Sequence, residues 1–356
     1  MNITIIGLGL IGGSLAKAFK SFNKNLTITA YDRKDTIESA LDQKIIDKGI
    51  FSLTELAEAD IIFIALPISD SLDALKQIAP FVKTDCIISD VCSVKGIFEE
   101  TWKSLSSKGY FIGGHPMTGK EKSGYENSDP LLFENAVYIL CGELEDSSAS
   151  KEFLKLLYSI GAKVKFLSAE IHDKITAKVS HLPQIVAVAL VNAITGGNNN
   201  NESIEFSAGG FRDMTRIASS PFGIWKPILF NNKENILDSI DEIILHLNEF
   251  KELLLEEDSN QIEDLFNSAR YMRDAIPRQN KGFLNPVFDL YVSVKDEPGV
   301  LSKLTTLLYN NNINIKDMEL LKIREGAKGT FRLSFESETA VELAKKLLEE
   351  NGFIFD

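Results

Sequence analysis

Short apolar runs alternate with amphipathic stretches over the first part of the chain. The first two runs, residues 3–6 and 26–31, are followed by runs at 61–66, 86–91, 110–112, 136–141 and 164–167. This alternation is typical of βαβ units, whose strands form a parallel sheet with helices on both faces. We therefore expect a Rossmann-type α/β domain over residues 1–167.

The pattern becomes helical from about residue 168 to residue 281. Apolar residues recur there at intervals of three and four, which predicts an amphipathic helix of more than five turns. We expect this all-helical domain to supply a subunit interface and to close a cleft over a substrate, so a homodimer is predicted. The residues that carry the interval pattern are Ile236, Ile240, Ile243, Leu247, Phe250 and Leu254.

A third pattern follows a polar linker at residues 279–282. Residues 288–294 alternate like a strand, and the segment DEPGVL at 296–301 predicts a turn that opens a helix through residue 308. Further strands are expected at 313–321 and 329–335, and a helix at 339–350. The order βαββαβ predicts a small α+β, ferredoxin-like domain over residues 286–356.

The first apolar run leads directly into the sequence GLGLIG at residues 7–12, which precedes a helical pattern. A G-x-G-x-x-G segment between a strand and a helix is the dinucleotide-binding fingerprint in its required context. Asp32 lies twenty residues beyond Gly12 and predicts NAD rather than NADP, because a carboxylate repels a 2′-phosphate; Arg33 keeps NADP open as an alternative. The predicted cofactor contacts are Gly7, Leu8, Gly9, Leu10, Ile11, Gly12, Asp32, Arg33 and Pro67.

Charge and composition narrow the class of partner. The 356 residues carry a formal net charge of −13, which makes nucleic acid or an anionic membrane an unfavourable partner. An anionic substrate would need a local cationic pocket. The three cysteines form no C-x-x-C pair and no disulfide framework, and no metal site is expected. The apolar runs are too short to span a bilayer and no signal peptide is evident, so a cytoplasmic enzyme is expected.

The segment GGHPMTGKEKSG at residues 113–124 holds the candidate for acid–base chemistry. It combines one histidine, His115, with a nearby carboxylate and four glycines. A histidine titrates near neutral pH and can accept a proton, while glycines allow a ligand to approach the backbone closely. The alternative is a surface loop with a solvated histidine.

Five motifs in one order resemble the prephenate/arogenate dehydrogenases of tyrosine biosynthesis that carry a C-terminal ACT domain. The motifs are GLGLIGGS at 7–14, SDVCSVK at 89–95, GHPMTGKEKSG at 114–124, SHLP at 180–183 and GFRDMTRIA at 210–218. The resemblance covers essentially the whole chain. It implies an NAD-dependent oxidative decarboxylation of prephenate to 4-hydroxyphenylpyruvate, and no fused chorismate mutase helix precedes the fingerprint.

The resemblance also implies roles for single residues. His115 would accept the proton of the substrate's 4-hydroxyl, and Ser93 would contact the substrate and orient the imidazole. Arg216 would bind a substrate carboxylate, although it could be a surface residue in a salt bridge. The pocket would also include His181, which could equally be structural, and Glu121. Trp225 could cover the ring or pack in the core. His172 and His246 belong to no motif and are expected to be solvated or to cap helices.

An ACT domain implies amino-acid sensing. Its ligand would bind where two such domains pair, at residues Asp296, Pro298, Gly299, Asn312 and Asn314, and tyrosine is the expected effector. The alternative is a ferredoxin-like domain that serves only for packing.

Three functions remain open. The first is an NAD-dependent prephenate dehydrogenase inhibited by tyrosine. The second is an arogenate or dual-specificity cyclohexadienyl dehydrogenase, whose substrate differs in an amino instead of a keto group. The third is a catalytically idle amino-acid sensor that acts through its ACT domain, against which the presence of His115, Ser93 and Arg216 argues.

Overall fold

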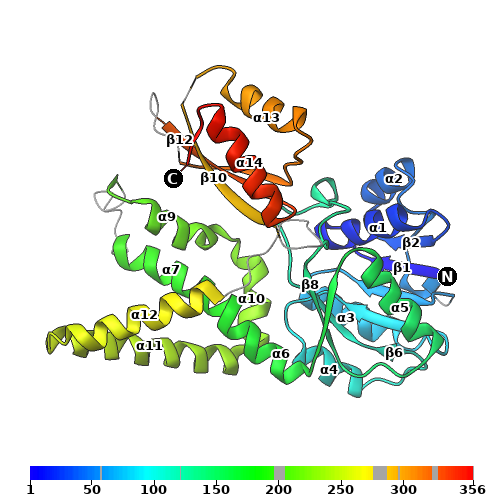
Figure 1. Ribbon diagram of the computed structural model, residues 1–356. Coiled ribbons are helices and arrows are strands. Elements are labelled where there is room, and N and C mark those ends of the chain that lie inside the picture. Colours follow the sequence, from blue (N-terminus) through cyan, green and yellow to red (C-terminus); the bar gives the residue numbers. More distant parts are fainter. Residues whose placement is uncertain are drawn as a thin grey trace. The chain divides into compact units, whose positions relative to one another are not determined.

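The computed structural model describes residues 1–56, 58–120, 122–195, 205–275, 287–295, 297–322 and 328–355. The chain divides into two compact units, Met1–Pro277 and Arg278–Asp356 (Figure 1). The predicted linker at 279–282 lies outside the described residues. The predicted boundary between a first domain ending at 167 and a second beginning at 168 falls inside the first unit and stays a prediction.

The first unit begins with a six-stranded parallel sheet in the order β3-β2-β1-β4-β5-β6, which confirms the Rossmann-type fold. The strand order reverses between β1 and β4, where ligands bind in folds of this kind. The strands are β1 Asn2–Ile6, β2 Thr27–Tyr31, β3 Lys48–Ile50, β4 Ile61–Ile64, β5 Ile87–Asp90 and β6 Tyr110–Phe111.

Helices cover both faces of this sheet, as the apolar runs predicted. Phe19 of α1, Phe63 of β4 and Phe153 of α5 pack together on one face, with ring centroids 5.5 and 5.7 Å apart. Leu75 and Phe98 belong to the core on the other face. The helices are α1 Leu10–Phe22, α2 Lys34–Asp42, α3 Ile68–Ile78, α4 Gly96–Lys103 and α5 Ser148–Ser159, with short 3-10 turns η1 Leu53–Leu56 and η2 Tyr125–Asn127.

The last three strands of this part form a separate sheet. Strands β7 Gly113–Pro116, β8 Val137–Cys141 and β9 Lys163–Leu167 lie in the order β7-β8-β9, with β7 antiparallel to β8. The prediction that runs 136–141 and 164–167 extend the parallel sheet is therefore wrong, because periodicity identifies a strand but not its partner. His115 lies on a strand and pairs with Ile139, so it does not belong to a loop.

The rest of the first unit is helical, as predicted. The helix expected over 236–254 is α11, and α12 packs beside it (Figure 1). A π-helical turn, η3, interrupts the chain between α6 and α7, and such turns occur frequently at functional sites. The elements are α6 Ala169–Thr176, η3 Ala177–His181, α7 Leu182–Thr195, α9 Gly209–Thr215, η4 Arg216–Ser219, α10 Phe222–Asn231, α11 Lys233–Leu255 and α12 Ser259–Ala275.

One helical stretch in the described residues, Ala169–Ile194, is long and apolar enough to cross a membrane by length and composition alone. From the sequence, we expected the apolar runs to be too short for this. A single helix of this kind is weak evidence for a membrane-spanning segment, because a buried core helix can have the same length and apolar composition. This stretch also contains buried His172, Asp173 and His181, whose polar contacts are described below.

The second unit has the predicted βαββαβ order. Its strands form a sheet in the order β11-β12-β10-β13, and β10 pairs with β12 in an antiparallel register that places Val292 opposite Phe331. Leu290, Leu304 and Leu348 belong to its own apolar core. The elements are β10 Phe288–Lys295, α13 Val300–Asn310, β11 Asp317–Lys322, β12 Lys328–Phe335, α14 Glu338–Glu350 and β13 Ile354–Phe355.

Candidate active site

The glycine-rich turn between β1 and α1 has the geometry that a pyrophosphate requires. Gly7 has a φ of +95°, and a Cβ there would lie 2.6 Å from the carbonyl oxygen of Ala65. A Cβ on Gly12 would lie 1.9 Å from the carbonyl oxygen of Gly7. A Cβ on Gly9 would meet nothing within 4 Å. Gly7 and Gly12 are therefore required by the fold, whereas Gly9 leaves open space at the N-terminus of α1, where an anion is stabilised.

Asp32 lies against this turn at the end of β2. Its carboxylate accepts hydrogen bonds from the amide of Leu8 at 2.5 Å and from the amide of Arg33 at 2.6 Å. The side chain of Arg33 is 81% exposed, and its Nε is 4.0 Å from the carboxylate. Pro67 precedes α3 at the end of β4, on the same edge of the sheet. The described residues thus fit the adenosine and pyrophosphate of a dinucleotide.

A buried ion pair lies between β5 and β7. The Nζ of Lys95 contacts the carboxylate of Asp90 and donates a hydrogen bond to the carbonyl oxygen of Gly114 at 2.7 Å. Lys95 is 1% exposed and Asp90 is fully buried. A Cβ on Gly114 would lie 2.4 Å from the carbonyl oxygen of Asp90. Gly114 therefore serves this packing, and not the close approach of a ligand that the sequence suggested.

His115 forms a hydrogen bond with His172. Its Nδ1 is 2.8 Å from the Nε2 of His172, and the two rings meet edge to face. The Nδ1 of His172 contacts Asp173 at 2.7 Å. Burial lowers the pKa of His115 well below its usual value, and the nearby charges of His172, Lys95 and His181 lower it further. His115 is consequently neutral at pH 7 and can accept a proton.

This arrangement corrects the expectation for His172. His172 is fully buried and hydrogen-bonded on both nitrogens, so it is neither solvated nor a capping residue. The Nδ1 of His115 is bonded to His172 and not to Ser93, whose side chain makes no hydrogen bond within the described part of the chain. Ser93 is half-buried after the end of β5, and its role stays a prediction. His246 is exposed on α11 and lies 3.2 Å from Glu249, as expected.

His181 ends the π-helical turn and is fully buried. Its Nδ1 is 3.2 Å from the side-chain amide of Asn232, and its Nε2 has no hydrogen-bond partner among the residues that the structure describes. Trp225 packs edge to face against the ring, with centroids 6.1 Å apart. Burial lowers the pKa of His181 to about 4, although the charge of Asp173 acts in the opposite direction. A buried nitrogen without a partner is a candidate contact for a ligand.

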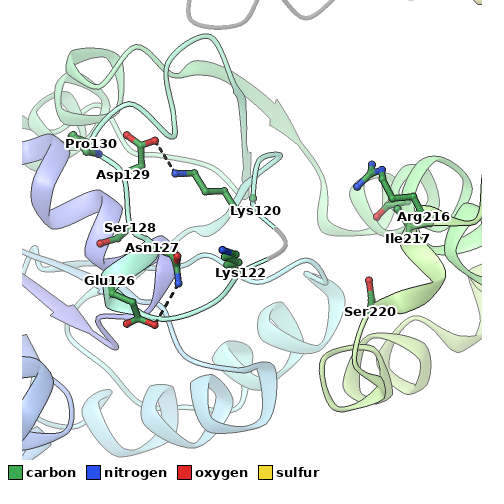
Figure 2. A pocket seen from close by; sticks show the side chains of 12 residues that line it. Lys120, Lys122, Glu126, Asn127, Ser128, Asp129, Pro130, Arg216, Ile217 and Ser220 are labelled. Carbon is green, nitrogen blue, oxygen red and sulfur yellow. Dashed lines mark hydrogen bonds and ion pairs between the residues drawn. The ribbon is translucent and has the colours of Figure 1, made fainter. Parts of the chain in front are cut away.

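A cavity of about 1090 Å³ lies between the segment 119–130 and the residues around η4. Figure 2 shows Lys120 and Lys122 on one side of this space and Arg216 and Ser220 on the other. Lys120 is bonded to Asp129 at 2.8 Å. The lining thus combines three basic side chains with the carboxylates of Glu126 and Asp129. Glu121, which the sequence placed in the pocket, lies outside the described residues, as do the asparagines at 198–201.

Three residues of this site were not predicted from the sequence to belong to it. His172, Asp173 and Asn232 are buried and link His115 to His181 through hydrogen bonds. The adjacent His-Asp pair at the start of a helical segment was the signal available in the sequence. Asn232 carried no signal, because its partners in the site, Asp173 and His181, lie more than 50 positions away.

The predicted effector residues lie in the second unit. Gly299 precedes α13 with a φ of +86° and lines a cavity of about 390 Å³. Asn312, whose φ is +58°, and Asn314 line a different cavity of about 460 Å³. Pro298 lies in the turn before Gly299, and Asp296 lies outside the described residues. Within one chain, the two predicted effector segments therefore line separate cavities.

The fold and the nucleotide turn are those of a dinucleotide-dependent dehydrogenase, and the same unit holds a buried neutral histidine and a cavity with three basic side chains. Family models match the whole arrangement: the prephenate dehydrogenase nucleotide-binding domain over residues 15–166, its dimerization domain over 168–270 and the ACT domain over 288–353. The chain belongs to the prephenate dehydrogenase family.

Individual relatives agree with this assignment. The chain is 36% identical to a prephenate dehydrogenase of Bacillus subtilis, over 98% of this chain and 95% of that one. It is 38% identical to a prephenate dehydrogenase of Lactococcus lactis, over 98% of both chains. A crystal structure of prephenate dehydrogenase from A. aeolicus with hydroxyphenyl propionate and NAD+ is 31% identical, with a TM-score of 0.71 over 78% of this chain and 98% of that one.

Proposed function

We propose that this protein is an NAD-dependent prephenate dehydrogenase. It converts prephenate and NAD+ to 4-hydroxyphenylpyruvate, CO₂ and NADH. The observation that carries this proposal is the neutral His115, whose Nδ1 is bonded to His172 and whose pKa is held well below its usual value by burial. A neutral imidazole can accept the hydroxyl proton of the substrate, which the reaction requires.

The chemistry divides between the cofactor and the chain. NAD+ held at the turn of Gly7, Gly9 and Gly12 would supply the acceptor for the hydride from C4 of the substrate. His115 accepts the proton of the 4-hydroxyl, so that the oxygen becomes a carbonyl. The bond from the ring to its carboxylate then breaks, CO₂ leaves, and the electron pair makes the ring aromatic. The phenolate oxygen recovers a proton, which leaves the net reaction balanced.

The three cations that line the cavity support binding of a substrate with two carboxylates. Arg216 lines the cavity opposite Lys120 and Lys122, and a guanidinium can bind a carboxylate through two parallel hydrogen bonds. His181 adds a buried nitrogen without a partner. We assign the carboxylate contact to Arg216 and a further substrate contact to His181. Glu121 and Ser93 remain proposed pocket residues.

The assay is NADH formation with prephenate, and with arogenate in parallel. His115→Asn should lower kcat by about 10²- to 10⁴-fold with a small change in KM, because the lost interaction strengthens in the transition state. Arg216→Gln should mainly raise KM. His246→Gln is the control, since His246 is exposed on α11. If only arogenate is oxidised, the protein is an arogenate dehydrogenase and the proposed substrate is wrong. If neither compound is oxidised, the result favours a catalytically idle amino-acid sensor.

We propose a homodimer formed by the helical part. Large apolar side chains there are 65% to 69% exposed in the single chain, which is typical of a surface that a partner covers. They are Phe222, Phe230, Leu245, Leu255 and Phe266. Light scattering should give twice the 39.5 kDa of one chain. Leu245→Glu should shift the protein toward the monomer, whereas Phe81→Glu, at an exposed position shortly after α3, should not.

We propose tyrosine as the effector of the second unit. Asp296, Pro298, Gly299, Asn312 and Asn314 would contact the amino acid between two chains. Coupling of about 1–3 kcal/mol between effector and substrate is typical, and prephenate would weaken tyrosine binding by the same factor. Truncation after Lys281 is a reasonable test, because the second unit has a separate core. An active truncated enzyme with unchanged inhibition would place tyrosine in the active site instead.

A further inference from the structure

Asp173 begins a chain of hydrogen bonds that ends at His115. Its carboxylate accepts bonds from the amides of Lys95 and Gly96, each at 2.8 Å, and contacts the Nδ1 of His172 at 2.7 Å. A carboxylate has only acceptor capacity, so the Nδ1 of His172 carries the hydrogen and donates it. The two amide bonds hold the carboxylate in place and thereby orient the ring of His172.

The hydrogen on His172 determines the hydrogen on His115. A neutral imidazole that carries hydrogen on Nδ1 has a bare Nε2, which can only accept. The Nε2 of His172 is 2.8 Å from the Nδ1 of His115, and the ring of His172 is fully buried. The Nδ1 of His115 therefore carries hydrogen, and its Nε2 is bare. A bare Nε2 is the form that can accept a proton from a substrate hydroxyl.

Asn232 acts on His181 in the opposite sense. Its Oδ1 accepts a hydrogen bond from the side chain of Asn235 at 2.7 Å, which orients the amide. Its Nδ2 donates to the carbonyl oxygen of Asp173 at 2.8 Å and lies 3.2 Å from the Nδ1 of His181. The Nδ1 of His181 is therefore the bare nitrogen. Its Nε2 carries hydrogen, is buried and has no partner within the described residues.

We propose that His172 and Asn232 are positioning residues that give the two site histidines opposite tautomers. His115 presents a bare Nε2 that accepts the hydroxyl proton, and His181 presents an Nε2–H that donates to an oxygen of the anionic substrate. The choice of reaction rests on the function proposed above, but the tautomers do not. When His115 accepts a proton, its Nδ1–H bond to His172 strengthens and Asp173 stabilises the charge through that ring.

The tautomers can be measured directly. The chain has four histidines, so ¹⁵N-histidine labelling gives a small set of signals that single substitutions can assign. Imidazole ¹⁵N shifts distinguish a bare nitrogen from one that carries hydrogen. The unmodified enzyme should show His115 with hydrogen on Nδ1 and His181 with hydrogen on Nε2. Hydrogen on Nε2 of His115, or a bare Nε2 on His181, would overturn the proposal without any reference to activity.

A matched pair of variants tests the effect on the reaction. His172→Gln keeps an amide oxygen that can accept from His115, whereas His172→Phe fills the space without an acceptor. We expect His172→Phe to lower kcat roughly 10- to 100-fold, the range for residues that orient a site histidine, with KM for both substrates within about twofold. His172→Gln should retain more of kcat. Equal kcat in both variants, or a loss confined to KM, would contradict the positioning role.

Asn232→Leu tests the second histidine. His181 should then lose its preference for hydrogen on Nε2 in the ¹⁵N spectrum, and KM for the anionic substrate should rise while kcat changes little. If this variant does not fold, the spectrum of the unmodified enzyme still decides the tautomer of His181. The protein could show both tautomers and still fail to oxidise prephenate. That result would contradict the proposed reaction but not the hydrogen-bond assignment.

Discussion

Lys95 and Asp90 form a fully buried ion pair that supports strand β7, because the same Nζ of Lys95 donates a hydrogen bond to the carbonyl oxygen of Gly114. Gly114 directly precedes His115. The pair therefore connects the end of the parallel sheet to the strand that carries the proton acceptor. Its cation also contributes to the low pKa of His115, after burial and the charge of His172.

Removing the cation of this pair should lower the free energy of unfolding. Lys95→Met leaves the carboxylate of Asp90 buried without its partner, and such changes lower the free energy of unfolding by about 3–5 kcal/mol. Lys103→Met is the matched control, because Lys103 and Glu99 form an exposed pair on α4 that is worth about 1 kcal/mol or less. Urea unfolding measures both. Similar losses in the two variants would show that burial does not distinguish these pairs.

Substitutions at two glycines of the nucleotide turn should affect different properties, the stability of the fold in one case and the binding of NAD in the other. Gly12→Ala places a methyl group 1.9 Å from the carbonyl oxygen of Gly7, so we expect it to lower the stability by about 1–3 kcal/mol or more. Gly9→Ala extends into open space and should leave the melting temperature unchanged, while KM for NAD rises roughly tenfold, equivalent to about 1.4 kcal/mol. Thermal melts and NAD titrations distinguish the two. A destabilised Gly9→Ala variant would argue against this division.

Asp32 should determine the choice of cofactor. Its carboxylate is held beside the amide of Leu8, where it would repel a 2′-phosphate. Two like charges placed side by side weaken binding by several kcal/mol. Asp32→Asn should therefore raise kcat/KM for NADP relative to NAD by roughly tenfold or more. The measurement is the ratio of the two values in each enzyme. A native enzyme that uses both cofactors equally would mean that Arg33 compensates the phosphate charge.

The stability of the first unit should fall as the solution becomes acidic. The pKa of His181 is about 4 in the folded chain against a usual 6.5, so the unfolded chain binds more protons below pH 6.5. Stability from this group is present above that pH and is lost as the pH falls toward 4. These two values give a loss of about 2 kcal/mol between pH 7 and pH 5.

Urea unfolding of His181→Gln at the two pH values tests this assignment. The variant should lose about 2 kcal/mol less than the native chain between pH 7 and pH 5, by the same linkage. His246→Gln should behave like the native chain, because His246 is exposed. An identical pH dependence in the native chain and the His181 variant would assign the acid sensitivity to other groups, His115 first among them.

The parts of the fold that local sequence determines could be predicted. The turn at Gly7 and Gly12 is required by contacts within a few residues and one neighbouring strand, so a short pattern was sufficient. The pairing of β7 with β8 could not be predicted, because no periodicity records which strand a given strand will meet. The expected parallel sheet therefore included two strands, β8 and β9, that belong to the other sheet, and it lacked β3.

The site was predicted in the same uneven way. His115 could be identified because it stands in a recognisable segment. His172 could not, because it lies 57 positions later in the chain and becomes a partner of His115 only when the helical part packs against β7. A polar residue on an amphipathic helix was reasonably expected to face solvent. Its burial depends on long-range contacts, and a single sequence contains no measure of those.

Asp173 has a further consequence for anyone who would redesign this enzyme. The same carboxylate accepts hydrogen bonds from the backbone amides of Lys95 and Gly96 at the start of α4, and it also accepts the hydrogen of His172. A library that varies position 173 therefore selects for foldable chains and for active chains at once, whereas the side chain at position 172 makes no bond to these amides. Laboratory evolution of this active site should accept replacements at 172 well before it accepts any at 173.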